Sequence, residues 1–564
     1  MHMLDYVNQI PAWFFCGSSP LCDSEHQGGM INIHVIALLF LVFLWICQKV
    51  QRLRMDIQKL SVVPMRRSWI WGHEFELFKR QACEMHIKWA TSMGSMYRVK
   101  AALFQPDIIV INDVAAMQYI FQNAYTYVKA PAFRPIIKRL IGNGIVYAEG
   151  EEHKHQRKLL APAFTSNAVK AMSDDIFACA DKMIHKLRAE LNSSTSGTNV
   201  VVDVAPMFST CTLNIIGRVA FGHDFGGGDS TEAKEISSAW HEDVLMAHTF
   251  VGFLAPRLIN LFPWITSLPI PVLPAESVSK RIVDRLAGKL LKDVHLQALN
   301  LDSTDILSLL VRDSKIKGKS EIRLSDDELL DNITTFMMVG HETSSASLIF
   351  TLLELARNPS VQHRLRQEIT AAGQLHYDSV QQLEYLDCVV KEGLRLHPAL
   401  PLTERVALQD DVIPLMQPLE TKSGRRLTSV SIKAGQVFHI PLTALNVSSQ
   451  IWGENAAQFM PERWLEREDL SVHRLPHGPW AEISTFSDGP RSCIGYRLAV
   501  SELKIIIAVL VRSFEFEDTG AKIEEYMLPT LQSFADGKAA SLPLKVFLVS
   551  DHGLLAGRSS ELVS

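Results

Sequence analysis

The residues best able to do chemistry lie near the end of the chain, around Cys493. The segment Phe486–Gly495 reads FSDGPRSCIG and matches the pattern F-x-x-G-x-R-x-C-x-G. The residues after it, Tyr496–Leu503, read as a helix, which places Cys493 at a helix N-terminus. Backbone N–H groups and the helix dipole favour an anion there, and the thiolate is the form of cysteine that binds metals. A buried structural cysteine in a glycine-rich loop is the alternative, but it does not explain why so many positions match.

A second pattern places Glu392 and Arg395 three residues apart in a predicted helix, Val389–Leu396. Residues at this spacing lie on one face of a helix and can form an ion pair. Most such pairs are solvated surface salt bridges, but the apolar residues and the Pro398–Pro401 turn around this one indicate a buried helix end. A buried pair needs further partners to offset its desolvation, and Arg463 in the sequence PERW is the predicted partner.

A third pattern, VGHETS, lies inside the apolar-periodic stretch Leu329–Leu355, which predicts a long helix. Gly340 weakens the helix locally, and the Thr343 hydroxyl can bond back to the backbone, so we expect a kink at this point. An acid, Glu342, beside a hydroxyl in such an opening is suited to deliver protons. The alternative is an ordinary core helix that contains a glycine and a threonine bonded to its own backbone.

A fourth segment, HKHQR, opens a basic helix that continues through Leu160. His153 and His155 are two residues apart and do not share a helix face, which argues against a metal site built from both. Arg157 is better suited to contact an anion, because its planar guanidinium group presents several donors in a fixed geometry.

In this order along the chain, these segments resemble the cytochrome P-450 family of haem-thiolate monooxygenases, and the resemblance covers the chain from about Pro64 onward. It implies that Cys493 is the axial ligand of the iron of haem b, where a thiolate favours cleavage of the O–O bond. It implies that Glu342 and Thr343 handle protons during oxygen activation. It also implies a structural group on the cysteine side of the haem, formed by Glu392, Arg395 and Arg463.

The resemblance further implies that the haem propionates are bound by His153, Arg157, Arg405 and Arg491. Arginine pairs well with a carboxylate through its planar fork. Gly489 and Gly495 are expected to let the backbone approach the flat macrocycle without a Cβ clash. Three positions depart from the family pattern: His153 stands where Trp is usual, Val339 where Ala or Gly is usual, and Asn446 where His is common. An imidazole still donates to a propionate, and no function is attached to Asn446.

The resemblance implies a mainly α-helical fold with small β-sheets, including strands at Ile108–Ile111 and Leu427–Ile432. The chain has 564 residues, of which 47% are hydrophobic and 21% charged, enough for a large buried core. Its net charge of −5 gives no indication of nucleic-acid binding. Eight cysteines lie scattered without C-x-x-C pairs, which fits a reducing compartment, and only Cys16 and Cys22 are placed to pair.

An apolar run at 31–47 predicts one transmembrane helix, at the short end of what spans a bilayer. No Lys or Arg precedes the run, and several basic residues follow it closely. The positive-inside rule then places residues 1–30 in the lumen of the endoplasmic reticulum and the catalytic body in the cytosol. We therefore expect a lumenal arm (1–30), the membrane anchor (31–47), a basic linker (48–72) and a haem-thiolate catalytic domain (73–564).

A second apolar stretch, Phe250–Leu273, contains four prolines and so cannot form a straight spanning helix. In the family this region lies over the substrate channel and dips toward the bilayer, while the alternative is an ordinary buried loop and helix pair. The substrate pocket is expected to be mainly apolar. Its predicted lining is the loop Phe133–Val146 with Phe336, Val339, Leu400 and Leu531.

The predicted reaction inserts one oxygen atom from O2 into a C–H or C=C bond of an apolar small molecule in specialised metabolism. The substrate classes considered are a terpenoid, sterol, fatty acid or polyketide. Electrons are expected from NADPH through a separate flavoprotein reductase, because the chain carries no G-x-G-x-x-G nucleotide motif. Two alternatives stay open: a haem-thiolate isomerase or dehydratase that does not use O2, and a non-catalytic, membrane-tethered haem or lipid binder. The neighbouring Glu342 and Thr343 argue against both.

Overall fold

The structure is a computed structural model. It describes residues 56–549 apart from 131–132, 194–199, 268–275, 298–304, 317–323, 422–423, 466–475 and 477. The chain divides into two compact units, Met1–Gln58 and Lys59–Ser564. The second unit holds the helices α2 to α20 and the strands β1 to β13, so it contains all the predicted site residues.

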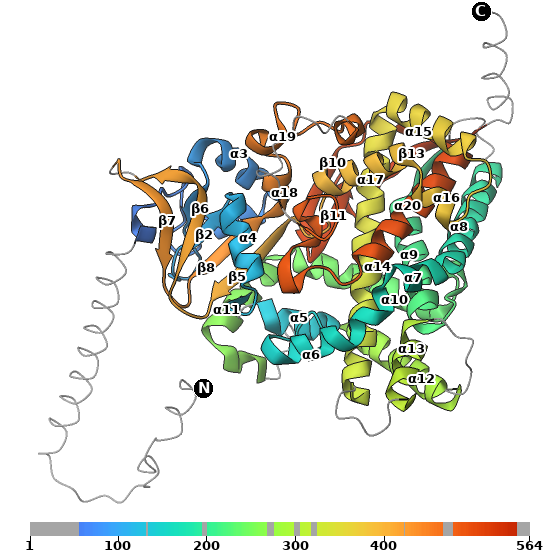
Figure 1. The fold of residues 1–564 in the computed structure, drawn as a ribbon, viewed down its shortest axis with the longest axis horizontal. Helices are drawn as coiled ribbons and strands as arrows, with labels where there is room; N and C mark the ends of the chain where they lie inside the picture. Colours follow the sequence, from blue (N-terminus) through green and yellow to red (C-terminus); the bar gives the residue numbers. More distant parts are fainter. Residues whose placement is uncertain are drawn as a thin grey trace, which may run out of the picture. The chain divides into compact units, whose positions relative to one another are not determined.

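A 32-residue helix, α14 (Asp326–Arg357), runs through the helical part of this unit (Figure 1). Its first turn is closed by reciprocal bonds, in which the Ser325 hydroxyl accepts from the Glu328 N–H and the Glu328 carboxylate accepts from the Ser325 N–H. Most of the residues of α14 are buried, so other elements cover it on several sides. The helix predicted at Leu329–Leu355 is confirmed.

The kink expected at Gly340 does not break this helix, because α14 is continuous from end to end. Thr343 does bond back as expected, since its hydroxyl donates to the Val339 carbonyl at 2.8 Å. Gly340 serves close packing instead: a Cβ there would lie 2.8 Å from the side chain of Ile216 in α9 (Ala205–Phe221). The two helices therefore approach each other closely at this glycine.

Further helices pack around α14 and share one large apolar core with it. The helix predicted after Cys493 is confirmed as α20 (Tyr496–Ser513), and α17 (Glu384–Leu396) contains the predicted E-x-x-R segment. The other helices are α2 (Glu74–Phe78), α3 (Glu84–Met93), α4 (Val114–Gln122), α5 (Phe133–Ile141), α6 (Gly150–Leu160), α7 (Ser166–Ala171), α8 (Ser173–Ser193), α10 (Thr231–Ala247), α11 (Phe250–Leu261), α12 (Val278–Gln297), α13 (Ile306–Ile316), α15 (Pro359–Ala371), α16 (Tyr377–Gln381), α18 (Leu442–Asn446) and α19 (Ser449–Trp452).

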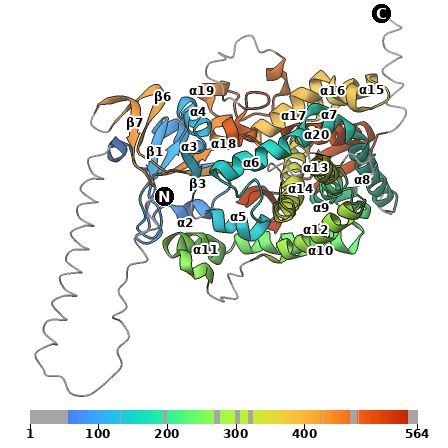
Figure 2. The ribbon, with the colours of Figure 1, turned by 60° about the horizontal axis from the view of Figure 1, so that its bottom comes forward.

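A five-stranded sheet lies beside the helical part, on the left of Figure 1. Its order is β1 (Met96–Val99), β2 (Ile108–Ile111), β8 (Val437–Pro441), β5 (Leu402–Ala407) and β3 (Tyr127–Lys129). β2 and β8 run parallel, and the other neighbours run antiparallel. In both views α5 and α6 lie between this sheet and α14 (Figures 1 and 2).

Three smaller sheets complete the fold, which is mostly helical as predicted. They are formed by β10 (Ile523–Leu528), β11 (Thr530–Ala535) and β12 (Lys538–Ala539), by β4 (Val200–Asp203), β13 (Pro543–Leu548) and β9 (Phe514–Asp518), and by β6 (Asp411–Glu420) and β7 (Arg426–Ile432). The strand predicted at Ile108–Ile111 is β2, and the one predicted at Leu427–Ile432 falls within β7, so both predictions are confirmed.

Two local predictions were wrong. Much of the predicted loop Phe133–Val146 is the helix α5, in which Ile137 and Ile141 are buried and charged residues lie between them. Apolar residues four apart are typical of an amphipathic helix, which explains why this segment folds as one. The segment HKHQR does not open its helix, because α6 already begins at Gly150 and has Glu151 in its first turn.

Among the described residues, no single helix is both long and apolar enough to cross a membrane. One pair, α10 and α11, passes that test only when joined, and the pair is bent by 76°. The prediction that Phe250–Leu273 forms no straight spanning helix is confirmed, since α11 ends at Leu261 and a short 3-10 helix (Pro263–Ser267) follows. The predicted arm and anchor, at 1–30 and 31–47, lie outside the described residues, as do Cys16 and Cys22.

Candidate functional site

The loop before α20 holds Cys493 in a tight turn. The Cys493 N–H donates to the Phe486 carbonyl at 2.8 Å, and the Ser492 N–H donates to the Gly489 carbonyl at 3.0 Å. Gly495 is the N-cap of α20, so Cys493 lies two residues before the cap. Among the five described cysteines, Cys493 alone is exposed. The buried ones are Cys83, Cys179, Cys211 and Cys388.

The surroundings of Cys493 act on its thiol in two directions. Other residues closely surround the Cys493 side chain, although solvent can still reach it. This burial raises the pKa of the thiol above its usual value, and the Gly495 N–H and the positive charge of Arg157 offset only part of the rise. Arg157 comes close because it donates to the Ser492 carbonyl at 2.7 Å and to the Ser492 hydroxyl at 3.2 Å. Arg157 therefore ties α6 to the cysteine loop and favours the thiolate.

Gly489 packs closely against a neighbouring helix. Its backbone has φ of +67°, and a Cβ would lie 2.3 Å from the Phe121 carbonyl oxygen in α4. The turn and the packing of the loop on α4 therefore both require a glycine here. Gly495 is not crowded in this way, because the nearest atom to a Cβ would be 3.8 Å away, in the Phe164 ring.

The structure brings together the four side chains predicted to bind the propionates. Burial and the positive charge of Arg491 lower the pKa of His153 to about 3 and that of Arg405 to about 10. Burial, with a smaller contribution from Arg491, also lowers the pKa of Arg157. His153 is therefore neutral at physiological pH, and its Nδ1 lies 3.2 Å from the Tyr125 hydroxyl.

Their contacts to acidic groups are few. Arg491 forms an ion pair with Glu149 at 2.5 Å. Arg405 instead donates to the Thr403 hydroxyl at 2.5 Å and to the Glu404 carbonyl at 2.9 Å, both of which are uncharged acceptors. A guanidinium group bonded to neutral oxygens keeps its positive charge unbalanced in a buried setting.

Lys129, which the sequence analysis missed, joins the same cluster. β3 and β5 pair so that Lys129 lies directly opposite Arg405, and like charges at such positions repel each other. Burial and the neighbouring Arg491 lower the pKa of Lys129 to about 7, and its ammonium group lies 3.5 Å from the Glu149 carboxylate. No motif marks this lysine, because its place depends on the pairing of strands that are far apart in the sequence.

The cation cluster therefore carries more positive charge than the surrounding protein balances. Its basic members are Lys129, Arg157, Arg405 and Arg491. Within the described part of the chain, Glu149 is the one carboxylate that forms an ion pair with any of them. A buried partner with two carboxylates suits such a cluster, and haem has two propionates. With the accessible thiol of Cys493 in a loop tied to Arg157, these residues fit a haem group.

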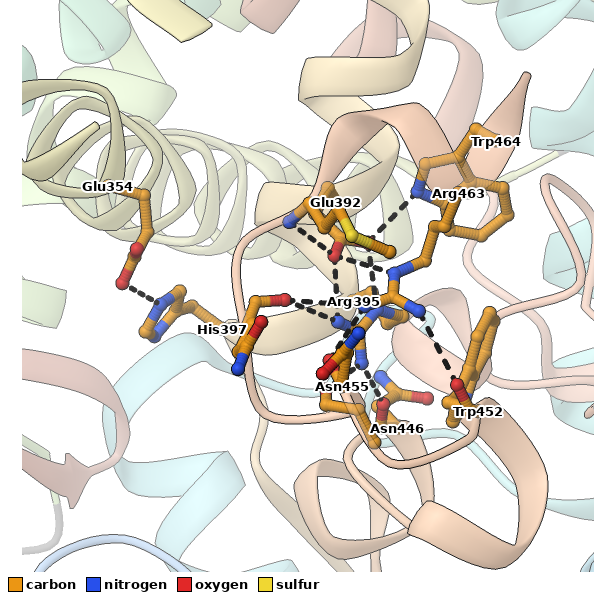
Figure 3. A network of polar contacts seen from close by, with 12 residues as sticks. Glu354, Glu392, Arg395, His397, Asn446, Trp452, Asn455, Arg463 and Trp464 are labelled. Atoms are coloured by element: carbon orange, nitrogen blue, oxygen red, sulfur yellow. Dashed lines mark hydrogen bonds and ion pairs between the residues drawn. The ribbon is translucent and has the colours of Figure 1, made fainter. Parts of the chain in front are cut away.

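Glu392 lies at the centre of a second buried group, the Glu392 cluster, shown in Figure 3. Arg395 donates to both of its carboxylate oxygens at 2.8 Å, and Arg463 Nε donates to Oε1 at 2.8 Å. The Trp464 indole and the Met460 N–H each donate at 3.0 Å. Burial acts to raise the pKa of Glu392, but these donors outweigh it and hold the pKa below its usual value. The predicted contact of Arg463 with the E-x-x-R pair is confirmed.

The Glu392 cluster extends to the segment before the cysteine loop. The fully buried Arg395 also donates to the carbonyls of Asn446 at 2.5 Å and Ala456 at 2.6 Å. The Asn446 side chain accepts from the Ser484 hydroxyl at 2.8 Å and donates to the Thr485 hydroxyl at 3.2 Å. Asn446, to which the sequence analysis attached no function, therefore links α17 to residues just ahead of Phe486.

Glu342 and Thr343 are neighbours on α14 but use different partners. The buried Glu342 carboxylate contacts His341 Nε2 at 3.1 Å and accepts from Gln532 Nε2 at 3.2 Å. Burial acts to raise the pKa of Glu342, but His341, then Trp240 and the amide of Gln532, outweigh it and hold the pKa below its usual value. The Thr343 hydroxyl bonds to the backbone of its own helix. The acid is thus ionised and turned toward β11 in this arrangement.

The predicted pocket residues differ in exposure. Phe336 and Val339 are partly buried on α14, Leu531 in β11 is buried, and Leu400 is exposed. None of them lines the described cavity of about 220 Å³, which lies against α2, α3, β5 and β8. Strand residues alternate between the two faces of a sheet, so the cavity residue Glu404 and the cation-cluster residue Arg405 lie on opposite faces of β5. This cavity therefore belongs to a different face from the cation cluster.

Among the described residues, no group of three His, Cys, Asp or Glu side chains is arranged to hold a metal ion. In a haem, by contrast, the macrocycle supplies most of the ligands and the protein adds an axial one.

Comparisons with known proteins agree with the fold. The family model described as Cytochrome P450 matches residues 63–535. Cytochrome P450 monooxygenase claP of Ampulloclitocybe clavipes is 31% identical over 536 residues, which cover 90% of this chain and 97% of that protein. Cytochrome P450 monooxygenase 205 of Postia placenta is 30% identical over 539 residues, which cover 92% of this chain and 97% of that protein.

This chain belongs to the cytochrome P450 family. It is an enzyme of the cytochrome P450 monooxygenase class, which is also the class that the names of its relatives state. Enzymes of this family carry a haem iron bound by a cysteine thiolate.

Proposed function

We propose that Cys493 binds the iron of haem b and that the enzyme inserts one oxygen atom from O2 into an apolar small molecule. One observation supports this proposal most strongly. The loop that holds the accessible thiol of Cys493 is hydrogen-bonded to Arg157, a member of the buried cation cluster. Iron with a thiolate ligand supplies the activation of O2. The protein positions charged groups and proton donors around the iron.

The side chains divide this work. The Gly495 N–H and the charge of Arg157 act against the burial that raises the pKa of Cys493, and so favour a thiolate at Sγ when the iron is bound. The cation cluster, with His153 as a neutral donor, holds and orients the propionates. The Glu392 cluster fixes α17 to the segment that leads into the cysteine loop. Glu342 takes protons up, and the Thr343 hydroxyl passes them on toward the oxygen side.

We propose a terpenoid, sterol, fatty acid or polyketide as substrate, in specialised metabolism. The support is the apolar character of Phe336, Val339 and Leu531 beside the Thr343 segment. Electrons come from NADPH through a separate flavoprotein reductase in this proposal.

We further propose that residues 31–47 anchor the enzyme in the endoplasmic reticulum membrane, with the catalytic body in the cytosol. Large apolar side chains exposed on the body support contact with a bilayer: Trp69, Phe104, Phe250, Phe262 and Trp264 are 82%, 67%, 46%, 45% and 61% exposed. Aromatic residues favour the membrane interface. Protease treatment of intact microsomes tests this topology, because a tag at the N-terminus should survive while the body is digested.

The proposed iron ligand is tested by Cys493→Ser. The reduced wild-type enzyme with CO should show the strongly red-shifted Soret band of thiolate-bound haem, and the variant should lose it. Cys388→Ser, which changes a buried cysteine in α17, should keep the band. An unchanged spectrum in Cys493→Ser would contradict the assignment.

The proposed reaction is tested by mass spectrometry of products formed with the reductase, NADPH and 18O2. The product should gain one labelled oxygen atom. A product that gains no label would favour an isomerase or dehydratase, and the absence of any product with intact haem would favour a binder.

A further inference from the structure

Three consecutive residues of α14 bind three different parts of the molecule. Ser344 donates to Glu502 of α20 at 2.8 Å, Thr343 donates to its own helix, and Glu342 accepts from Gln532 of β11. The carboxylate of Glu342 is thus directed away from Thr343, and among the described residues no hydrogen bond joins these two side chains. An acid that serves the Thr343 hydroxyl must therefore turn away from β11 to do so.

Two hydrogen bonds hold the Gln532 side chain in position. Its side-chain amide donates to Glu342 Oε2 at 3.2 Å and to the Thr530 hydroxyl at 2.8 Å. Gln532 and Glu342 are 8% and 6% exposed, so water does not readily replace the amide. The other carboxylate oxygen, Oε1, lies 3.1 Å from His341 Nε2. Each oxygen of the acid has its own contact, and the donor on the β11 side is the Gln532 amide.

We propose that Gln532 is a positioning residue for proton delivery, whose amide keeps the Glu342 carboxylate ionised and turned toward β11 between proton transfers. The inference deepens the proposed function, because it concerns the acid assigned to supply Thr343. In each transfer Glu342 takes one proton from water and gives one proton up, so the carboxylate returns to its anionic form and no electrons move. Loss of the Gln532 amide removes one donor from the buried anion while the contact with His341 stays, and this change favours the protonated acid.

The variant Gln532→Met tests the inference, because methionine keeps the unbranched shape of glutamine and lacks the amide. Gln362→Met is the matched control: Gln362 is also buried, but its amide donates to the carbonyls of Leu355 and Phe516. Both variants should lose stability, since each removes buried hydrogen bonds. Only Gln532→Met should change the titration of Glu342.

The first readout is infrared spectroscopy of the haem-loaded enzyme without reductase or substrate. The carboxylic acid band of Glu342 is the one that Glu342→Gln removes. At about pH 5, slightly above the usual pKa of glutamic acid, wild type and Gln362→Met should show no such band. Gln532→Met should show it, and its absence there would overturn the inference even if the enzyme turned out not to be a monooxygenase.

The second readout is the pH dependence of product formed per NADPH consumed. As the pH is lowered and Glu342 becomes protonated, this ratio should fall. The pH at which it reaches half its maximum should be about 0.5 to 1 unit higher in Gln532→Met, because one donor to the anion is lost. A profile that matches wild type would also overturn the inference. If wild type formed no oxygenated product at all, the proposed function would fail, and the infrared result would still decide the role of Gln532.

Discussion

The cation cluster and the Glu392 cluster are both buried and ionic, but they differ in how their charges are balanced. At Glu392, one carboxylate meets two guanidinium groups, and backbone carbonyls accept most of the remaining donors. In the cation cluster, Lys129 and Arg491 form ion pairs with Glu149, whereas Arg157 and Arg405 bond to uncharged oxygens. Two of these cations, Lys129 and Arg405, even lie opposite each other on paired strands.

This difference shows which cluster has its charges balanced by protein groups alone. The donors around Glu392 satisfy it so well that its pKa stays low in spite of burial. Burial also lowers the pKa of Arg395, but its two hydrogen bonds to Glu392 act against this change. Burial and the charge of Arg491 lower the pKa values of Lys129 and Arg405, and Arg405 has no carboxylate bonded to it. The Glu392 cluster should therefore stabilise the fold by itself, whereas the cation cluster should stabilise it once a dianion such as haem is bound.

The largest effect is expected for Glu392→Ala. The change leaves Arg395 and Arg463 buried without their carboxylate, which should cost about 3–5 kcal/mol of unfolding free energy. Chemical unfolding of the haem-free and haem-bound proteins should show a similar loss in both. Asp378→Ala, which removes an exposed ion pair with Lys170, should change stability little. A loss confined to the haem-bound protein would break the comparison.

A smaller effect is expected for Arg405→Met, which should weaken haem binding rather than the stability of the haem-free protein. The haem-free protein should be as stable as wild type or more so, because a buried, unbalanced cation is replaced by an apolar side chain. Haem should dissociate about 10- to 100-fold more readily, since a bond to a charged group is lost. Transfer of haem to a scavenger protein measures this. If Arg405→Met destabilised the haem-free protein as much as Glu392→Ala does, the two clusters would not differ as proposed.

The contrast also explains what the sequence could predict. Glu392 and Arg395 lie on one helix face, so their pairing follows from local spacing. Lys129 enters the cation cluster through the pairing of β3 with β5, which no local pattern encodes. Gly340 was expected to kink α14, but its neighbour Ile216 comes from another helix, and the close contact between the two could not be read from either segment. The contact of Arg463 with the Glu392–Arg395 pair was also predicted, because a buried ion pair needs a further partner. The places of Lys129 and Ile216 were not predicted, because no motif marks either residue.

The smallest effect concerns the pH dependence of stability in the haem-free protein. Burial, with the positive charges around it, lowers the pKa of Lys129 to about 7 from the 10.5 of a free lysine. Between these values the unfolded chain binds the proton and the folded chain does not, so the contribution of Lys129 to stability rises with pH. His397 acts oppositely, because Glu525 and Glu354 raise its pKa to about 10 in spite of burial. The test must therefore compare Lys129→Met with wild type rather than follow wild type alone.

Lys129→Met should be more stable than wild type at pH 7, because it removes a lysine that loses its charge on folding. This advantage should shrink by about 1–2 kcal/mol between pH 7 and pH 9. The free-energy cost of deprotonating Lys129 on folding falls as the pH approaches the pKa of a free lysine. Urea unfolding of both haem-free proteins at the two pH values measures the difference. With haem bound, the propionates should keep Lys129 charged, and the difference between the two proteins should no longer depend on pH over this range. Parallel pH profiles in the haem-free proteins would mean that Lys129 is already balanced by Glu149, and that the cation cluster needs no further anion.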